Sequence, residues 1–143
     1  MDEIARRIVR AVDEAYEVVK DDRHADVPVV HKVKTIQLPT QLKETGPKPM
    51  HEMELHVLRI GDAVVCTNSF ELFTEYGLRI KARSKAVQTF VVQLCCKHSS
   101  YLPTAVATQG GGYGVDRGVG PEGGQALVDK TVEVIDSMWS ESK

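Results

Sequence analysis

The apolar residues of this chain follow two different periods, and this alternation constrains the fold more than any other feature. Between residues 3 and 20 they recur at steps of three and four, which is typical of an amphipathic helix whose apolar side covers another surface. Between residues 52 and 60 apolar and polar residues alternate, as in a strand with one buried face. A chain with both periods packs helices on a sheet, so the sequence predicts an α/β fold.

The remaining segments complete an order of helix, strand, hairpin, helix, strand, long loop and helix. The turn Gly61-Asp62 joins the alternating segment to an apolar run, which predicts the hairpin. This order predicts a mixed β-sheet with packed helices. The other expected elements are a strand over 29–38, a loop over 39–49, a helix over 70–84, a largely buried strand over 87–95, a glycine-rich loop over 109–124 and a helix from about Pro121.

Length and composition are ordinary for a globular protein. The 143 residues are 42% hydrophobic and 27% charged, which predicts one core and a single domain over residues 1–143. The net charge of −2 and the pI near 6.2 give no attraction to nucleic acid, which excludes it as an expected partner. No apolar run reaches the ~18 residues of a membrane span, and residues 1–7 lack the apolar core of a secretion signal.

The cysteine spacing argues against a metal centre or a disulfide framework made by this chain alone. Cys66, Cys95 and Cys96 are odd in number and two of them are adjacent, which favours reduced, mostly buried thiols. Cys95 and His98 have a Cys-x-x-His spacing, but no second pair completes a tetrahedral set. A structural zinc site from these residues is therefore not expected.

The first segment suited to chemistry lies where the strand ending near Cys66 gives way to the second expected helix. Ligands in α/β proteins bind at such carboxyl ends of strands, and the carboxylate of Glu71 stands there. A carboxylate at a helix start can hold a metal ion. Glu71 can also belong to a capping box in which Asn68 is the N-cap. Spacing alone favours the cap, but the two interpretations are not exclusive.

A second segment, residues 97–104, follows the next expected strand. If the two strands are parallel neighbours, their carboxyl ends meet and Glu71 and Tyr101 face one pocket. Tyrosines near strand ends are more often packing residues with a hydrogen-bonded hydroxyl, and spacing does not decide between the two roles. The glycine-rich residues 109–114 lack the ending of a phosphate loop, which leaves a loop over a pocket edge or a simple connection.

Four segments in succession resemble the neutral (non-lysosomal) ceramidase-like hydrolases. They are residues 60–73 with the sequence IGDAVVCTNSFELF, residues 77–84 with GLRIKARS, Tyr101-Leu102-Pro103-Thr104, and Gly111-Gly112-Tyr113. The resemblance extends over about residues 53–139 and matches the closing part of that family's catalytic domain. It therefore covers only the carboxyl-terminal part of the domain.

The resemblance implies a zinc-dependent amide hydrolase in which a metal-bound water attacks an acyl amide of a lipid-like substrate. Glu71 falls where the family has its carboxylate zinc ligand, and Tyr101 where it has a tyrosine that both lies at the metal and serves catalysis. A phenol beside zinc can stabilise the oxyanion that develops on the attacked carbonyl. The family's histidine ligands lie upstream, and nothing before Met53 matches them, so this chain is expected to carry part of the site.

Three hypotheses follow from the incomplete ligand set. The chain can be the closing segment of a larger zinc hydrolase whose upstream segment is missing. Alternatively, it can be a non-catalytic binding or assembly module derived from the same fold, which the amphipathic first helix favours because that helix lies outside the matched region. The third hypothesis is a homo-oligomer in which a partner chain completes the zinc site with His98 or His31.

Overall fold

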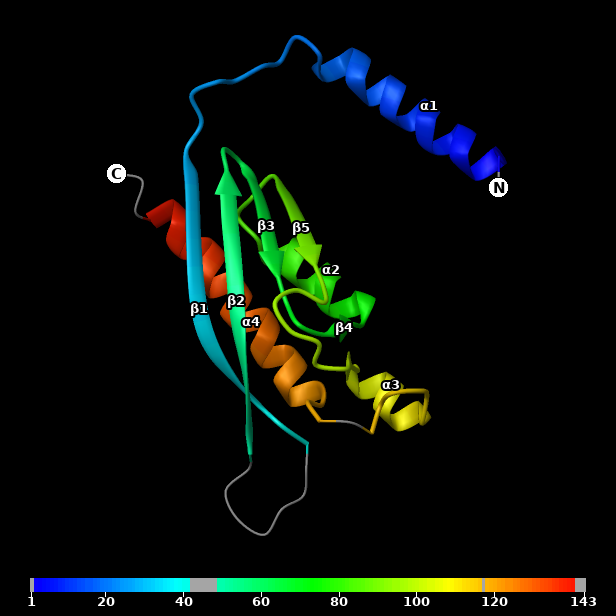
Figure 1. Ribbon diagram of the computed structural model, residues 1–143, viewed down its shortest axis with the longest axis vertical. Helices are drawn as coiled ribbons and strands as arrows, with labels where there is room; N and C mark the ends of the chain where they lie inside the picture. The colour runs from blue at the N-terminus through cyan, green and yellow to red at the C-terminus, as the bar shows by residue number, and fades with distance from the viewer. Residues whose placement is uncertain (1, 42–48, 117, 141–143) are drawn as a thin grey trace.

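The computed structural model describes residues 2–41, 49–116 and 118–140 of the chain. It contains both helices and strands, which confirms the predicted α/β class with a mixed sheet (Figure 1). The elements in chain order are α1 (Asp2–Val19), β1 (Val29–Pro39), β2 (Met50–Ile60), β3 (Ala63–Thr67), β4 (Glu71–Leu72), α2 (Thr74–Arg83), β5 (Gln88–Val92), β6 (Tyr101–Leu102), α3 (Ala105–Gly110) and α4 (Pro121–Ser140).

The main sheet has four strands in the order β1-β2-β3-β5. β1 pairs with β2 and β2 with β3 in antiparallel fashion, whereas β3 and β5 are parallel. The predicted hairpin is confirmed as β2–β3, and its turn places Gly61 at φ 57°, a conformation that glycine adopts without steric cost. β4 and β6 form a separate, two-residue parallel ladder beyond the main sheet.

One face of the main sheet is covered by α2 and α4, and the core lies between them (Figure 1). Alternate residues of β2 enter this core, which is why its period of two is so regular. α4 begins at Pro121 as expected, and a Cβ at Gly124 would overlap the ring of Tyr76, so glycine permits α2 and α4 to approach closely. The fully buried side chains include Leu38, Leu55, Val57, Phe70, Tyr76, Leu102, Leu127, Val128 and Ile135.

The opposite side of the main sheet is not covered by any described element, and we call it the open sheet face. It carries Leu58, Val65 and Phe90 in one row across β2, β3 and β5. The expectation of a largely buried strand over 87–95 is therefore wrong: β5 is shorter, and Phe90 and Val92 are 51% and 40% exposed. Apolar content indicates burial only if both faces of the sheet are packed.

α1 projects away from the body of the protein (Figure 1). Its predicted amphipathic character is confirmed, but none of its residues is buried, so the expectation that its apolar side covers another surface is not met within one chain. Neither α1 nor any other helix in the described part of the chain is long and apolar enough to cross a membrane.

Two predicted loops differ from the structure or fall outside it. The loop over 39–49 lies mostly outside the described residues, apart from its ends, where Thr40 donates a backbone hydrogen bond to Pro49. The glycine-rich loop over 109–124 is shorter than expected because α3 extends through Gly110 and ends at Gly111 in the left-handed conformation. The Thr104 hydroxyl caps α3 by accepting a hydrogen bond from the Ala107 amide.

Candidate functional site

The chain leaves β3 through a turn that the Asn68 side chain holds in place. Its Oδ1 accepts a hydrogen bond from the Phe70 amide at 3.0 Å, and its Nδ2 donates to the Val92 carbonyl at 3.4 Å. α2 begins only at Thr74 with Phe73 as its N-cap, so the capping-box interpretation of Asn68 and Glu71 is wrong. The Asn68 side chain forms an Asx turn, which frees Glu71 to lie in β4.

The prediction that two parallel strands bring their carboxyl ends together is confirmed by β3 and β5. Beyond these ends the two chain segments continue side by side, because the Ser99 amide donates to the Ser69 carbonyl at 2.8 Å. Leu94, Cys96 and Ser100 adopt φ values of 59°, 65° and 67° in this stretch. Non-glycine residues take such values at a cost of about 1–3 kcal/mol each, and functional sites commonly store strain of this kind.

Glu71 and Tyr101 are register partners in the β4–β6 ladder, and the Glu71 amide donates to the Ser100 carbonyl at 3.0 Å. The interaction of the Tyr101 phenol with the Glu71 carboxylate is the main cause of a raised pKa of Tyr101. Partial desolvation and the negative charges near the phenol raise this pKa further. The structure therefore brings together the two residues that the sequence had singled out.

His98 of the same chain lies beside this pair. Its Nε2 is 3.5 Å from Oε1 of Glu71, and the two side chains are 69% and 34% exposed. The hypothesis that a partner chain must supply His98 is not required by this geometry. His31 lies on the open sheet face instead, where its Nε2 is 3.1 Å from Nδ1 of His56. Sequence spacing could not place His98 because the strained turns before Tyr101 decide its direction.

Two aromatic side chains and the glycine-rich loop pack around Tyr101. The rings of Tyr113 and Phe73 meet it edge to face, with centroids 5.4 and 6.4 Å away. Gly114 has φ 75°, and a Cβ there would lie 2.7 Å from Cγ of Tyr101. The glycine is needed for this close approach, so the loop is more than a connection: it packs on the Tyr101 ring.

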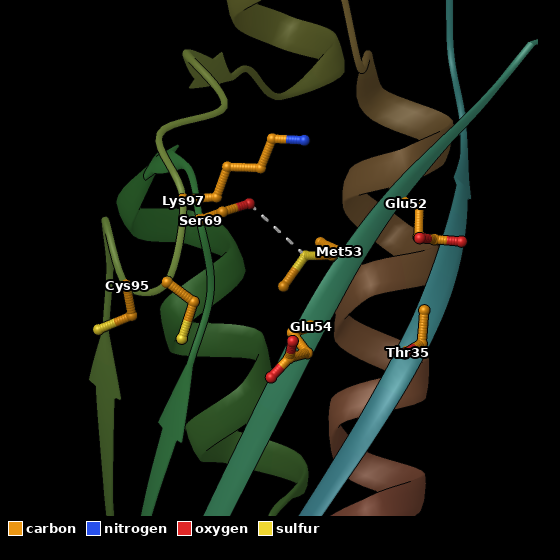
Figure 2. Close-up of a pocket in the computed structure, with 8 residues that line it drawn as sticks. Thr35, Glu52, Met53, Glu54, Ser69, Cys95 and Lys97 are labelled. Carbon is orange, nitrogen blue, oxygen red and sulfur yellow. Dashed lines mark hydrogen bonds between the residues drawn. The ribbon is translucent and has the colours of Figure 1, made fainter.

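A small pocket that the sequence did not indicate lies between β2 and the segments that follow β3 and β5 (Figure 2). Its walls come from β1, β2 and the segments that follow β3 and β5, and the Ser69 hydroxyl lies 3.9 Å from the Met53 sulfur within it. Ser69 also accepts a hydrogen bond from the Ser99 hydroxyl at 2.8 Å, which connects the pocket wall to the segment before Tyr101. The lining residues are Thr35, Glu52, Met53, Glu54, Ser69, Cys95, Cys96 and Lys97.

The three thiols are free, and they differ in exposure. Cys66 is buried in the core, and this burial raises its pKa to about 12. Cys95 is half-buried and Cys96 is exposed, so the expectation of mostly buried thiols is wrong for Cys96. Cys96 has a left-handed backbone with φ 65° and lines the pocket at Ser69.

The donor atoms at this site fit a zinc ion only in part. The carboxylate of Glu71, the phenol of Tyr101 and the imidazole of His98 are oxygen and nitrogen donors of the kind zinc accepts. However, the described residues contain no group of three or more histidine, cysteine or acidic side chains that could hold a metal ion. A catalytic zinc commonly has three protein ligands and a water. The described residues do not supply three such histidine, cysteine or acidic side chains at this site.

Of the comparisons with known proteins, the one with solved structures found a similar fold. No protein-family model matches the sequence, and no curated protein matches it. A solved structure described as a ceramidase complexed with C2 is similar, with a TM-score of 0.57 and 15% sequence identity. The match covers 62% of this chain and 15% of that chain, so this chain spans only a small part of its length. At such identity the likeness shows the fold alone: this chain has a ceramidase-like fold.

Proposed function

We propose that this chain contributes the carboxylate of Glu71 and the phenol of Tyr101 to a zinc-dependent amide hydrolase site, whose histidine ligands come from outside the chain. The observation that carries the proposal is the pairing of these two side chains on adjacent residues of the β4–β6 ladder. The ceramidase-like fold supports it, because it makes the resemblance of the surrounding motifs to that family physically coherent.

Each side chain has a role that its surroundings support. Glu71 would hold the metal with its carboxylate, and the backbone hydrogen bond to Ser100 fixes its position. Tyr101, with its raised pKa, keeps its proton at neutral pH and can donate it in a hydrogen bond to a developing oxyanion. Zinc, when bound, supplies an activated water and polarises the substrate carbonyl. The packing of Tyr113 and Gly114 on Tyr101 would limit the motion of the phenol.

The substrate class we propose is an acyl amide with a lipid-like chain, in keeping with the ceramidase fold. The site is shallow and open, since the Glu71 and His98 side chains are 34% and 69% exposed. A substrate would be desolvated there only if a further protein segment covered the site. We propose that one further protein segment would both supply the remaining metal ligands and cover the site.

Zinc affinity tests this proposal directly. The full chain is titrated with zinc against a chromogenic chelator, together with Glu71→Gln, Tyr101→Phe and the control Glu75→Gln, which alters a nearby exposed carboxylate on α2. We expect weak binding that falls at least about tenfold in the first two variants and is unchanged in the control. Unchanged affinity in both site variants would sink the proposal, and hydrolysis of an acyl amide by the chain alone would refute the claim of a partial site.

His98→Ala decides whether the third donor belongs to the same chain. Its Nε2 lies within the distance expected for two ligands of one zinc ion. A fall in zinc affinity comparable to that of Glu71→Gln adds His98 to the ligand set. Unchanged affinity leaves Glu71 and Tyr101 as the chain's contribution.

A second candidate function is a non-catalytic assembly module. The specific observation in its favour is α1, which is amphipathic, lies outside the ceramidase-like motifs and has no buried residue in the single chain. Zinc-independent association that survives the loss of the Glu71 and Tyr101 side chains would favour this function over catalysis.

A further inference from the structure

α1 divides into an apolar half and a polar half without exception. Successive residues of a helix are about 100° apart, and on this spacing all ten apolar residues of the 18-residue helix fall on one half, centred on Ile8, Val12 and Val19. The other eight residues are charged and fill the opposite half. A helix with this distribution is built to lie on an apolar surface.

The apolar half of α1 has no partner in the single chain. Ile8 and Val12 are each 60% exposed and Val19 is 53% exposed. A soluble protein rarely leaves so many neighbouring apolar side chains in water, and such a surface commonly marks an interface. The position of α1 in Figure 1, away from the sheet and the other helices, agrees with these exposures.

The open sheet face is the second uncovered apolar surface. Cross-strand partners place Leu58, Val65 and Phe90 in one row, and Val29, Ile60 and Ala63 in the neighbouring row. Phe90 is 51% exposed and Ile60 is 46% exposed. The apolar end of this face lies where β1 and β5 begin, and the other end is polar, with Glu52 and Glu54.

The charges of α1 indicate whether its apolar half packs on a membrane or on the open sheet face. The helix has five acidic and three basic residues, the basic ones being Arg6, Arg7 and Arg10. A net acidic helix is not attracted to an anionic membrane surface. All three arginines lie in its first half, so a helix that runs antiparallel to β1 brings them to the Glu52 and Glu54 end of the open sheet face. The charge pattern therefore favours this protein surface.

The connector between α1 and β1 directs the helix away from its own sheet. Asp22 donates a backbone hydrogen bond to Val19 at 2.9 Å, and the Arg23 Nε donates to the Lys20 carbonyl at 2.9 Å, so the helix end is extended by a turn. At the other end the Gly61 amide donates to Pro28 at 2.9 Å, which fixes the connector to the β2–β3 turn. A helix held away from the rest of its own chain can pack on a second copy of the protein, as in domain swapping.

We propose that α1 of one copy packs its apolar half on the open sheet face of a second copy, and that the second copy does the same in return. The 18-residue helix is about 27 Å long and about 10 Å wide. Two such contacts bury on the order of 1,100 Å² in total, which exceeds the ~1,000 Å² expected of a specific interface. This exchange covers both apolar surfaces at once, and it does not depend on the proposed hydrolase site.

The mass of the full chain in solution, measured by sedimentation equilibrium, is the first test. We expect a dimer, and Ile8→Asp should raise the dimer dissociation constant about 30-fold or more because a charge enters the centre of the contact. Glu14→Gln on the polar half, away from the three arginines, is the matched control and should leave a dimer. Ile8 has no buried contact in the single chain, so the thermal unfolding of Ile8→Asp monomers should be unchanged. A monomeric wild-type chain would overturn the proposal.

Mixing two defective variants distinguishes exchange from other dimers. Ile8→Asp places a charge on the apolar half of α1, and Phe90→Asp places one on the open sheet face. In a dimer of either variant alone, both contacts are therefore disrupted. Their mixture has one intact contact, between the α1 of Phe90→Asp and the face of Ile8→Asp. We expect heterodimers in the mixture, weaker than the wild-type dimer because only one contact remains, and monomers of each variant alone. Dimers held by two helices or by two sheets would not be restored by mixing.

A disulfide identifies which chain the helix covers. Val12→Cys and Val65→Cys are placed in one chain that also carries Cys95→Ser and Cys96→Ser, and oxidation is followed by non-reducing electrophoresis. A covalent dimer supports exchange between copies. A covalent bond within one chain would show that α1 folds onto its own sheet, and this result would overturn the proposal, as would the absence of any disulfide.

Discussion

Glu71 and Tyr101 are exact register partners across the β4–β6 ladder, and the Glu71 carboxylate raises the pKa of the Tyr101 phenol. They are 30 positions apart in the sequence, and two strands with parallel directions bring them together. This relationship is the centre of the candidate site, and it has consequences that do not require a metal.

The effect of Glu71 on Tyr101 should be measurable as a change in the pKa of the Tyr101 phenol. In metal-free protein, Glu71→Gln removes the negative charge and the carboxylate acceptor that together raise the pKa of Tyr101. The pKa should fall toward its ordinary value, as followed by phenolate absorbance. Tyr101→Phe identifies which of the titrating tyrosines is responsible. A Tyr101 pKa that Glu71→Gln leaves unchanged would contradict the interaction of the two side chains.

Gly114→Ala should destabilise the protein by about 1–3 kcal/mol, because Gly114 has φ 75° and an added Cβ would overlap the Tyr101 ring. Gly112→Ala is the control: its Cβ would meet only Cγ1 of Val115, at 3.9 Å. We expect a change within about 0.5 kcal/mol for the control. Urea unfolding of the two variants measures both effects, and equal stability would show that the loop does not pack on Tyr101.

Gly124→Ala and Gly77→Ala should change stability in opposite directions although both lie in helices. A Cβ at Gly124 would overlap the Tyr76 ring between α2 and α4, and overpacking of this kind costs about 1–3 kcal/mol. No atom lies within 4 Å of a Cβ at Gly77, so alanine there should stabilise α2 by about 0.5–1 kcal/mol. Thermal unfolding compares them, and a destabilising Gly77→Ala would argue against the observed packing of α2.

The stability of the protein should decrease below about pH 6.5 in part because of His51. Burial lowers the pKa of His51, and the positive charge of Lys97 lowers it further. The unfolded chain therefore binds a proton more readily, so the stability contribution is present above the unfolded pKa and is lost as the pH falls from there through the lower folded pKa. His51→Leu should reduce this pH dependence, while His24→Gln, on the exposed connector, should not. The free energy of unfolding measured at pH 7 and at pH 5 decides this.

Thiol reactivity should separate Cys96 from Cys66. Cys96 is exposed, whereas Cys66 is buried and its pKa is raised to about 12, so little thiolate forms at neutral pH. With an aromatic disulfide reagent we expect Cys96 to react first, and Cys66 to react only after denaturant is added. The rapid phase should disappear in Cys96→Ser. Rapid labelling of Cys66 in the native protein would contradict its position in the core.

The sequence predicts which residues make up the candidate site, but not its local geometry. Glu71 and Tyr101 follow the ends of two apolar runs, and the parallel pairing of these runs is enough to place them at one edge of the sheet. The role of Asn68 was misread because an N-cap and an Asx turn use the same side-chain oxygen, and only the pairing of β4 with β6 decides between them. The pocket at Ser69 depends on left-handed turns at Leu94 and Cys96 that no sequence period reveals.

The sequence by itself determined the kinds of element and most of their positions. The period of two in β2, the Gly61 turn and the start of α4 at Pro121 are local properties, set by backbone sterics and by the repeat of apolar residues. Only the tertiary structure decided which apolar surfaces are covered. The apolar half of α1 and the side of β5 that carries Phe90 look as buried in the sequence as the core does, but burial depends on which element lies opposite, and this is a property of the whole chain and its partners.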